Sequence, residues 1–313
     1  MRALSSRPRG RALLPAVLAL LLTAVASGCA AEGEQRSGIV VTTNILGDIT
    51  RNIVGDQAEV TVLMKPGADP HSFGISAQEA ALLENAELVI HNGLGLEEGV
   101  HRNVEAADQA GVPTLAVGEA VDPIDYTEGE TQGQADPHFW TDPVRVRQAV
   151  DLIAAQVSEQ VDGVDTERIQ ANAEEYGGQI DELHEENTRA FAEIPEERRR
   201  LVTNHHVFGY LAQRYDFEVI GAVIPSGTTL ASPSASDLES LSSAVEQAGV
   251  PAVFADSSQP DRLARVMAEE AGLDIEVIPL FSESLTAEGE GAATYVEMTR
   301  ANTDAIVRGL TRE

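Results

Sequence analysis

Residues 165–192 read DTERIQANAEEYGGQIDELHEENTRAFA, and this stretch predicts one long helix. Its apolar side chains recur close to helical spacing, at Ile169, Ala173, Ile180, Leu183 and Phe191. With a rise of about 1.5 Å per residue the helix is about 40 Å long, which is enough to cross from one domain to another. The pair Gly177-Gly178 is a weak point that favours a bend, and Pro195 ends the helix.

Strands and helices alternate on both sides of this helix. Short apolar runs predict strands before it at residues 39–43, 60–64, 87–91 and 114–117, and after it at residues 200–204, 217–223, 252–255 and 275–279. This alternation indicates mainly parallel sheets with helices on both faces. Among these helices, one is predicted from about Leu96 to Ala110, and Asp142-Pro143 predicts the start of another. The sequence therefore predicts an α/β fold of two Rossmann-like lobes, residues 38–162 and 196–313, joined by a linking helix within residues 163–195. A single crossing favours a cleft between the lobes, where ligands bind.

Residues 1–28 have the composition of a lipoprotein signal peptide. Four arginines without acidic neighbours precede an apolar run at residues 12–25, which is short for a membrane span. The run leads to Ala26-Ser27-Gly28-Cys29, which resembles the lipobox of bacterial lipoproteins; the alternative is an ordinary signal peptide with an incidental cysteine. The resemblance implies a lipid on Cys29, a tether at residues 29–37, and an exported protein anchored on the outer face of the cytoplasmic membrane.

The cysteine content and the net charge of the chain exclude some covalent links and some classes of binding partner. Cys29 is the one cysteine in the sequence, so no internal disulfide forms. The formal net charge of −30 disfavours nucleic acid and anionic membrane surfaces as partners. Such an acidic surface either concentrates cations or simply keeps the protein soluble.

The tetrapeptide ADPH occurs twice, as residues 68–71 and 135–138. Its proline fixes the backbone just before the histidine and restricts the preceding aspartate to an extended conformation. Each aspartate either orients a histidine ring by a hydrogen bond or only forms an Asx turn. Residues 119–135, which lead into the second copy, are rich in acids and predict a loop. We interpret this loop either as a flexible flap or as a segment that binds cations weakly.

Three histidines lie in loops that follow or border predicted strands: His71, His138 and His205. Loops at the carboxyl ends of parallel strands gather around ligands, and neutral imidazoles suit zinc and similar metals. The loop after the last strand offers Glu283 as a carboxylate. None of these residues has the short spacing of a zinc finger or an HExxH helix, so spacing alone leaves metal binding as one hypothesis.

Six motifs carry a resemblance to a known family. In chain order they are PGADPHSF, ENAELVIHNG, ADPHFWTDP, TNHHVFGYLAQRY, LFSESL and YVEMTRANTDAIVRGL. They resemble the zinc/manganese-binding components of metal ABC transporters, the cluster A-I solute-binding proteins. The resemblance covers nearly the whole chain after the signal peptide, and a long linking helix is a hallmark of that family.

The resemblance implies four metal ligands: His71, His138, His205 and Glu283. Glu283 departs from the family pattern, which usually has an aspartate there, and Asp256 is a weaker candidate for the carboxylate. His206 is an alternative to His205. The resemblance further implies an ABC permease and its ATPase as partners, a metallochaperone as a candidate donor, a monomer, and no catalytic residues.

The ligand set favours zinc over manganese. Three imidazoles and one carboxylate form the nitrogen-rich tetrahedral set typical of zinc, whereas manganese sites trade a nitrogen for a second carboxylate. We therefore expect an extracytoplasmic zinc-binding component of an importer that captures the metal and delivers it to the permease. The alternatives are a manganese-binding component, a surface adhesin that holds metal for structure, and a zinc hydrolase in which Glu283 acts as a general base.

Overall fold

The computed structural model describes residues 38–127, 131–259, 262–270 and 275–312. The predicted signal peptide (1–28) and tether (29–37), with Cys29, lie outside the described residues. Within the described ranges, no helix combines the length and the apolar character that a membrane crossing needs.

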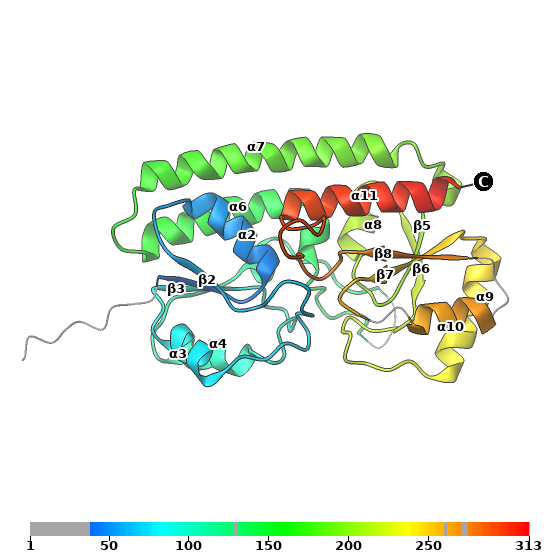
Figure 1. The fold of residues 1–313 in the computed structure, drawn as a ribbon, viewed down its shortest axis with the longest axis horizontal. Helices are drawn as coiled ribbons and strands as arrows, with labels where there is room; N and C mark the ends of the chain where they lie inside the picture. Colours follow the sequence, from blue (N-terminus) through cyan, green and yellow to red (C-terminus); the bar gives the residue numbers. More distant parts are fainter. Residues whose placement is uncertain (1–37, 128–130, 260–261, 271–274, 313) are drawn as a thin grey trace, which may run out of the picture. The chain divides into compact units, whose positions relative to one another are not determined.

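The first lobe is built on a parallel sheet in the strand order β2-β1-β3-β4 (Figure 1). Its strands are β1 (Ile39–Val41), β2 (Val60–Val62), β3 (Leu88–His91) and β4 (Thr114–Ala116). Its helices are α2 (Asn44–Val54), α3 (Ala77–Glu84), α4 (His101–Gln109), α5 (Val117–Ala120), the 3-10 turn η1 (Phe139–Thr141) and α6 (Pro143–Gln160). Strand β1 is buried along its whole length, which explains why it is continuously apolar instead of alternating. One apolar cluster fills the side of α2 and α6, and another fills the side of α3 and α4.

The second lobe repeats this architecture with the strand order β6-β5-β7-β8. Its strands are β5 (Arg200–Thr203), β6 (Glu218–Ala222), β7 (Ala252–Asp256) and β8 (Glu276–Leu280). Its helices are the 3-10 turn η2 (Glu196–Arg198), α8 (Gly209–Tyr215), α9 (Ala235–Ala248), α10 (Arg262–Glu270) and α11 (Tyr295–Thr311). Two apolar clusters again lie on opposite faces, one under α8 and α11 and one under α9 and α10. The predicted α/β fold with two parallel-sheet lobes is therefore the observed fold.

Helix α6 begins at the polar residue that the sequence indicated, but α4 begins later than predicted. Asp142 caps α6 by accepting a hydrogen bond from the Val144 amide at 2.9 Å, and Pro143 is the first helical residue. The helix predicted from about residue 96 begins only at His101. The residues before it form turns, because the buried Glu97 carboxylate accepts hydrogen bonds from the Thr42 hydroxyl and from the Asn92 amide, both at 2.7 Å.

Helix α7 (Thr166–Phe191) is one uninterrupted helix of 26 residues that serves both lobes. Ile180 and Leu183 belong to the apolar cluster of the first lobe, and Phe191 belongs to that of the second. The chain does not break at Gly177-Gly178. Gly177 lies where α6 approaches, because a Cβ there would meet the Arg147 guanidinium at 2.6 Å, while Gly178 has open space around it.

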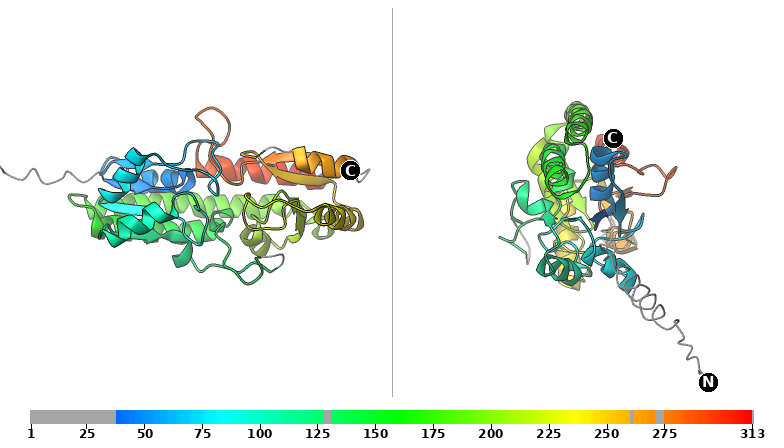
Figure 2. Two further views of the ribbon diagram at one scale, coloured as in Figure 1. Left: turned by 90° about the horizontal axis from the view of Figure 1, so that it is seen from below. Right: turned by 90° about the vertical axis from the view of Figure 1, so that its left-hand side faces the viewer.

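A second helix, α11, also packs into both cores. Tyr295 and Met298 at its start lie in the first lobe's cluster, and Ile306 and Leu310 near its end lie in the second lobe's cluster. Figures 1 and 2 show α11 running beside α7 along the same side of the two sheets. The described chain thus joins the lobes by two long helices, and the start of α11 packs with the first lobe. The division at residues 38–162, 163–195 and 196–313 stays a proposal.

Gly178→Ala is expected to stabilise the protein. An alanine in an exposed helix interior restricts the unfolded chain and should add about 0.5–1 kcal/mol to the free energy of unfolding. Gly177→Ala is the matched control, because its methyl group must displace the Arg147 guanidinium and should give less gain or a loss. Urea denaturation followed by circular dichroism measures both. Equal gains from the two variants would contradict the close approach of α6 at Gly177.

Candidate metal centre

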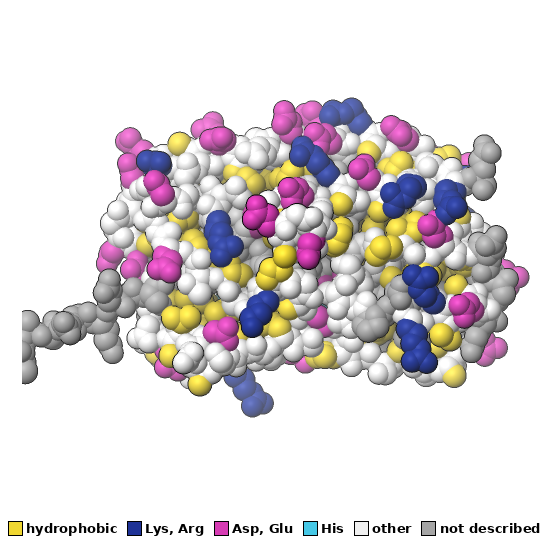
Figure 3. Space-filling view, in the orientation of Figure 1, with side chains coloured by type: hydrophobic (Ala, Val, Ile, Leu, Met, Phe, Trp, Pro, Cys, Tyr) yellow, Lys and Arg dark blue, Asp and Glu magenta, His cyan; other side chains and the backbone are white. Residues whose placement is uncertain are grey.

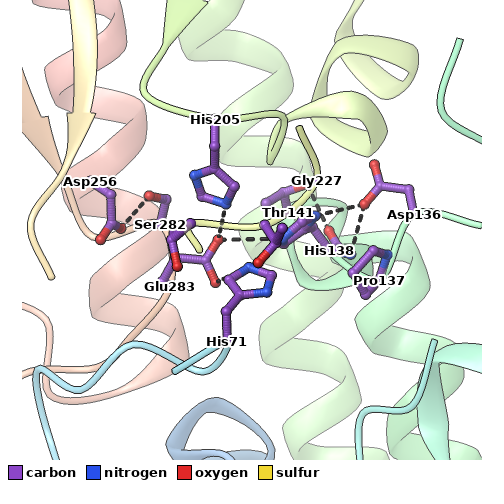
Figure 4. Close-up of polar contacts among 12 residues, drawn as sticks. His71, Asp136, Pro137, His138, Thr141, His205, Gly227, Asp256, Ser282 and Glu283 are labelled. Atoms are coloured by element: carbon purple, nitrogen blue, oxygen red, sulfur yellow. Dashed lines mark hydrogen bonds and ion pairs between the residues drawn. The ribbon is translucent and has the colours of Figure 1, made fainter. Parts of the chain in front are cut away.

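Four side chains from four loops meet between the lobes (Figure 4). His71 lies beyond the end of β2, His138 directly precedes η1, His205 follows β5 and Glu283 follows β8. The loops after β2, β5 and β8 leave the carboxyl ends of parallel strands, the edge at which ligands gather in open α/β sheets. His71 and His138 come from the first lobe, whereas His205 and Glu283 come from the second. The structure thus brings together all four side chains that the sequence selected.

The spacing of their polar atoms fits one small cation. Nε2 of His138 lies 3.4 Å from Nε2 of His71 and 3.4 Å from Oε1 of Glu283. Oε1 of Glu283 is 2.9 Å from Nε2 of His205, and Oε2 is 3.9 Å from Nε2 of His71. A tetrahedral ion with ligands at about 2.0–2.1 Å separates those ligands by about 3.3–3.4 Å. The four groups therefore match a compact tetrahedral site with little rearrangement.

These groups are buried without enough hydrogen-bond partners. The exposed fraction is 2% for His71, 1% for Glu283 and zero for His138 and His205. Both ring nitrogens of His205 and both carboxyl oxygens of Glu283 lack a hydrogen bond, so the short distance between them is not that of an aligned donor and acceptor. Buried polar atoms are nearly always paired, and a cation bound by all four groups would pair Nε2 of His205 and the Glu283 carboxyl group.

Burial also sets the protonation of the cluster. Burial, with smaller contributions from the neighbouring rings of His138 and His205, lowers the pKa of His71 to about 2. Burial likewise lowers the pKa of His138 and of His205, so all three imidazoles are neutral at neutral pH. Burial raises the pKa of Glu283 well above its ordinary value, with a smaller contribution from Asp256. Neutral imidazoles are ready to coordinate a metal, whereas Glu283 must first lose a proton.

Asp136 fixes the ring of His138. Its Oδ1 accepts hydrogen bonds from the His138 amide at 2.9 Å and from Nδ1 of the ring at 2.7 Å. A carboxylate bonded to Nδ1–H leaves the lone pair of Nε2 directed at the other ligands. Burial raises the pKa of Asp136 to about 7, and its hydrogen bond with the His138 amide opposes that shift. The second ADPH thus combines an Asx turn with orientation of the histidine.

Asp69, in the first ADPH, forms the same turn but has a different second partner. Its Oδ1 accepts from the His71 amide at 3.0 Å, as in the other copy. Its Oδ2 accepts from Thr229 Oγ1 at 2.7 Å and from Gln259 Nε2 at 2.9 Å, both in the second lobe. Asp69 therefore joins the lobes beside His71. No local pattern in the sequence could have identified Thr229 or Gln259.

The two alternative ligands lie outside the four-residue group. His206 has its amide bonded to the Ser226 carbonyl at 3.0 Å, and its ring lies 6.4 Å from that of Tyr126. Asp256 accepts hydrogen bonds from the hydroxyls of Ser258 and Ser282. Its contact with Ser282 holds the loop that carries Glu283, as Figure 4 shows.

Comparison with known proteins places the chain in a family. The family model described as "ZnuA: Zinc-uptake complex component A periplasmic" matches residues 39–309. The manganese-binding lipoprotein MntA of Halalkalibacterium halodurans is 29% identical over 94% of this chain and 97% of its own length. The zinc-binding protein TroA of Treponema pallidum is 31% identical over 90% of this chain and 91% of its own length.

Solved structures agree with this assignment. The periplasmic zinc-binding protein TroA from Treponema pallidum superposes with a TM-score of 0.79 at 29% identity, covering 88% of this chain and all of TroA. The relatives carry names of both manganese-binding and zinc-binding proteins, so the comparisons support divalent metal binding and leave the metal open. The family model is named for a component of a zinc-uptake complex. The chain belongs to the ZnuA family, the metal-binding substrate-binding components of ABC transporters.

Proposed function

We propose that the protein captures zinc outside the cytoplasm and delivers it to the permease of a metal ABC importer. In this proposal His71, His138 and His205 each supply Nε2, and Glu283 supplies a carboxylate oxygen. The observation that carries it is the set of buried, unpaired nitrogen and oxygen atoms at separations that suit a tetrahedral ion.

Capture links the two lobes through the metal. Two ligands come from each lobe, so a bound ion makes two bonds to each lobe and thereby links them. Asp69 already bridges the same interface. Asp136 keeps Nε2 of His138 free for the ion by holding Nδ1. Tyr210 of the second lobe donates to the Asp136 carbonyl at 2.7 Å, which positions this aspartate from the other side. Contacts from both lobes thus hold these side chains in place, which favours tight binding.

Zinc is preferred because the site offers three imidazoles. Nitrogen-rich, four-coordinate sets suit zinc, whereas manganese prefers more oxygen ligands and a higher coordination number. Manganese is the second candidate, since relatives such as MntA are named for it. Both oxygens of Glu283 also face histidine rings, so a bidentate carboxylate is within reach.

The cellular setting in this proposal follows from the family and the sequence. We propose that a lipid on Cys29 anchors the exported monomer, that the permease and its ATPase receive the metal, and that a metallochaperone is a candidate donor. The face in Figure 3 shows acidic and basic side chains interspersed, without a broad basic patch that would suit nucleic acid.

Competition between zinc and manganese tests the metal. Chelator-stripped protein should bind one zinc per chain and prefer it to manganese. His205→Asp replaces an imidazole by a carboxylate and should weaken zinc binding by about tenfold or more while shifting preference toward manganese. His206→Asp makes the same change one residue along, outside the four-residue group, and should alter zinc affinity by less than about threefold.

The outcomes separate the parts of the proposal. Equal effects of His205→Asp and His206→Asp would remove His205 from the ligand set. Tighter manganese in the wild type would make manganese the cargo and leave the transport class intact. Absence of stoichiometric binding of either metal would contradict the site itself.

Zinc binding should release close to one proton at pH 7. Burial keeps Glu283 protonated in the metal-free protein, whereas the low pKa values of the three facing histidines leave no proton to lose there. Asp136, with a raised pKa of about 7, contributes at most a further fraction. Below the raised pKa of Glu283, affinity should therefore fall by about tenfold per pH unit.

Isothermal titration in buffers of different ionisation enthalpy measures this proton count. Glu283→Gln has no proton to release and should reduce the count by about one, at the cost of weaker binding. A release of two or more protons by the wild type would show that the histidines are charged before the metal binds. That result would contradict the effect of burial on their pKa.

A further inference from the structure

We propose that the metal enters and leaves through the cavity beside Tyr126, and that the Tyr126 side chain closes the inner end of this passage. This inference rests on the proposed function, because it concerns how zinc reaches the four ligands. Those ligands are at most 2% exposed, so some side chain must move before an ion can reach them.

The cavity reaches a direct partner of a metal ligand. It has a volume of about 220 Å³ and is lined by Tyr126, Asp136, His206, Phe208 and Gly209, among others. Asp136 lies on its wall and is bonded to Nδ1 of His138. A second cavity, beside Trp140 and Ser282, holds only about 20 Å³. That is room for about one water molecule. Of these two cavities, the larger one therefore suits the passage of an ion.

Shorter hydrogen bonds close the other sides of the site. Beside His71, Asp69 accepts from Thr229 at 2.7 Å and from Gln259 at 2.9 Å. Beside Glu283, Asn44 donates to Ser284 Oγ at 2.8 Å, and the Trp140 indole donates to the Ser282 carbonyl at 2.9 Å. These contacts have ordinary lengths for strong hydrogen bonds.

Tyr126 closes the remaining side by weaker contacts. Its hydroxyl lies 3.3 Å from Nδ1 of His138 and 3.4 Å from the Gly227 carbonyl in the second lobe. Hydroxyl hydrogen bonds are usually about 2.7–2.8 Å, so both of these contacts are long. The hydroxyl also bonds the carboxyl group of Asp136, which itself lines the cavity. The Tyr126 backbone, by contrast, is fixed, because its amide and carbonyl pair with Gln134 and Gly133 at 2.9 Å. Opening at this residue therefore needs a movement of the side chain alone.

Gly227 permits this closed position. A Cβ at residue 227 would lie 2.2 Å from the Tyr126 hydroxyl oxygen, well inside contact distance. The nearest atoms belong to the end of a side chain, so an alanine there would displace Tyr126 and leave the backbone in place. Gly227→Ala should therefore open the passage without removing the tyrosine.

Rates of zinc binding and release test the proposal. In the purified full chain, Tyr126→Ala and Gly227→Ala should each raise both the association rate constant and the rate of zinc loss to a chelator by about tenfold. Because both rates rise together, Kd should stay within about threefold of the wild-type value. Stopped-flow fluorescence with a zinc-sensitive chelator measures both rates. Tyr126→Phe, which keeps the ring, should give a smaller increase, and the exposed neighbour Thr127→Ala should give none.

The double variant identifies the route by which Gly227→Ala acts. If its methyl group works only by displacing Tyr126, Tyr126→Ala combined with Gly227→Ala should be no faster than Tyr126→Ala alone. Three results would each overturn the assignment. The first is a double variant whose rate increase is the product of the two single increases, the second is unchanged rates in Tyr126→Ala, and the third is faster zinc release without faster binding. Failure of the wild type to bind zinc at one per chain would instead overturn the proposed function, so the two failures are distinguishable.

Discussion

The structure depends on one constraint: three imidazoles and a carboxyl group are buried against one another between two lobes. Leaving a buried polar group unpaired costs about 1–3 kcal/mol, and five nitrogen and oxygen atoms on His71, His205 and Glu283 are in that position. A divalent cation would remove this cost for Nε2 of His205 and for the two Glu283 oxygens, because all four groups lie within one coordination shell. Binding and stability are therefore linked, and any metal that fits the site stabilises the closed arrangement.

The frame around the site explains how this arrangement persists. Helices α7 and α11 each contribute to the apolar cores of both lobes, so wide separation of the lobes would break both cores. Asp69 adds hydrogen bonds across the interface, and Arg214 of α8 pairs with Asp142 at the start of α6 at 2.8 Å. Such a frame favours local movement over hinge opening. The Tyr126 side chain, whose hydroxyl lies 3.3 Å from Nδ1 of His138 and 3.4 Å from the Gly227 carbonyl, is placed for such a local movement.

Sequence patterns predicted the fold, and the resemblance to the family selected the four side chains. The apolar runs of β1 and β3 and the cap at Asp142 are local signals, and they placed the strands and α6. The loop positions of His71, His138 and His205 made a metal site one hypothesis, and the resemblance to the family supplied these histidines and Glu283 as the expected ligands. The late start of α4 was missed because the turns before it are held by bonds of the Glu97 side chain to Thr42 and to the Asn92 amide, which leave no mark in hydrophobic periodicity. The contacts of Asp69 with Thr229 and Gln259 join residues far apart in the chain, and the packing of the start of α11 with the first lobe is likewise tertiary. The two ADPH copies show the limit most clearly, since identical tetrapeptides orient a ring in one loop and join the lobes in the other.

X-ray absorption at the zinc edge of the zinc-loaded protein is the sharpest test of the proposed ligand set. Three histidines and one glutamate predict four nitrogen or oxygen neighbours at about 2.0–2.1 Å, with the outer-sphere scattering of three imidazole rings. Fewer than three imidazoles, or six oxygen-rich neighbours at longer distances, would contradict the proposal that His71, His138, His205 and Glu283 together hold the metal.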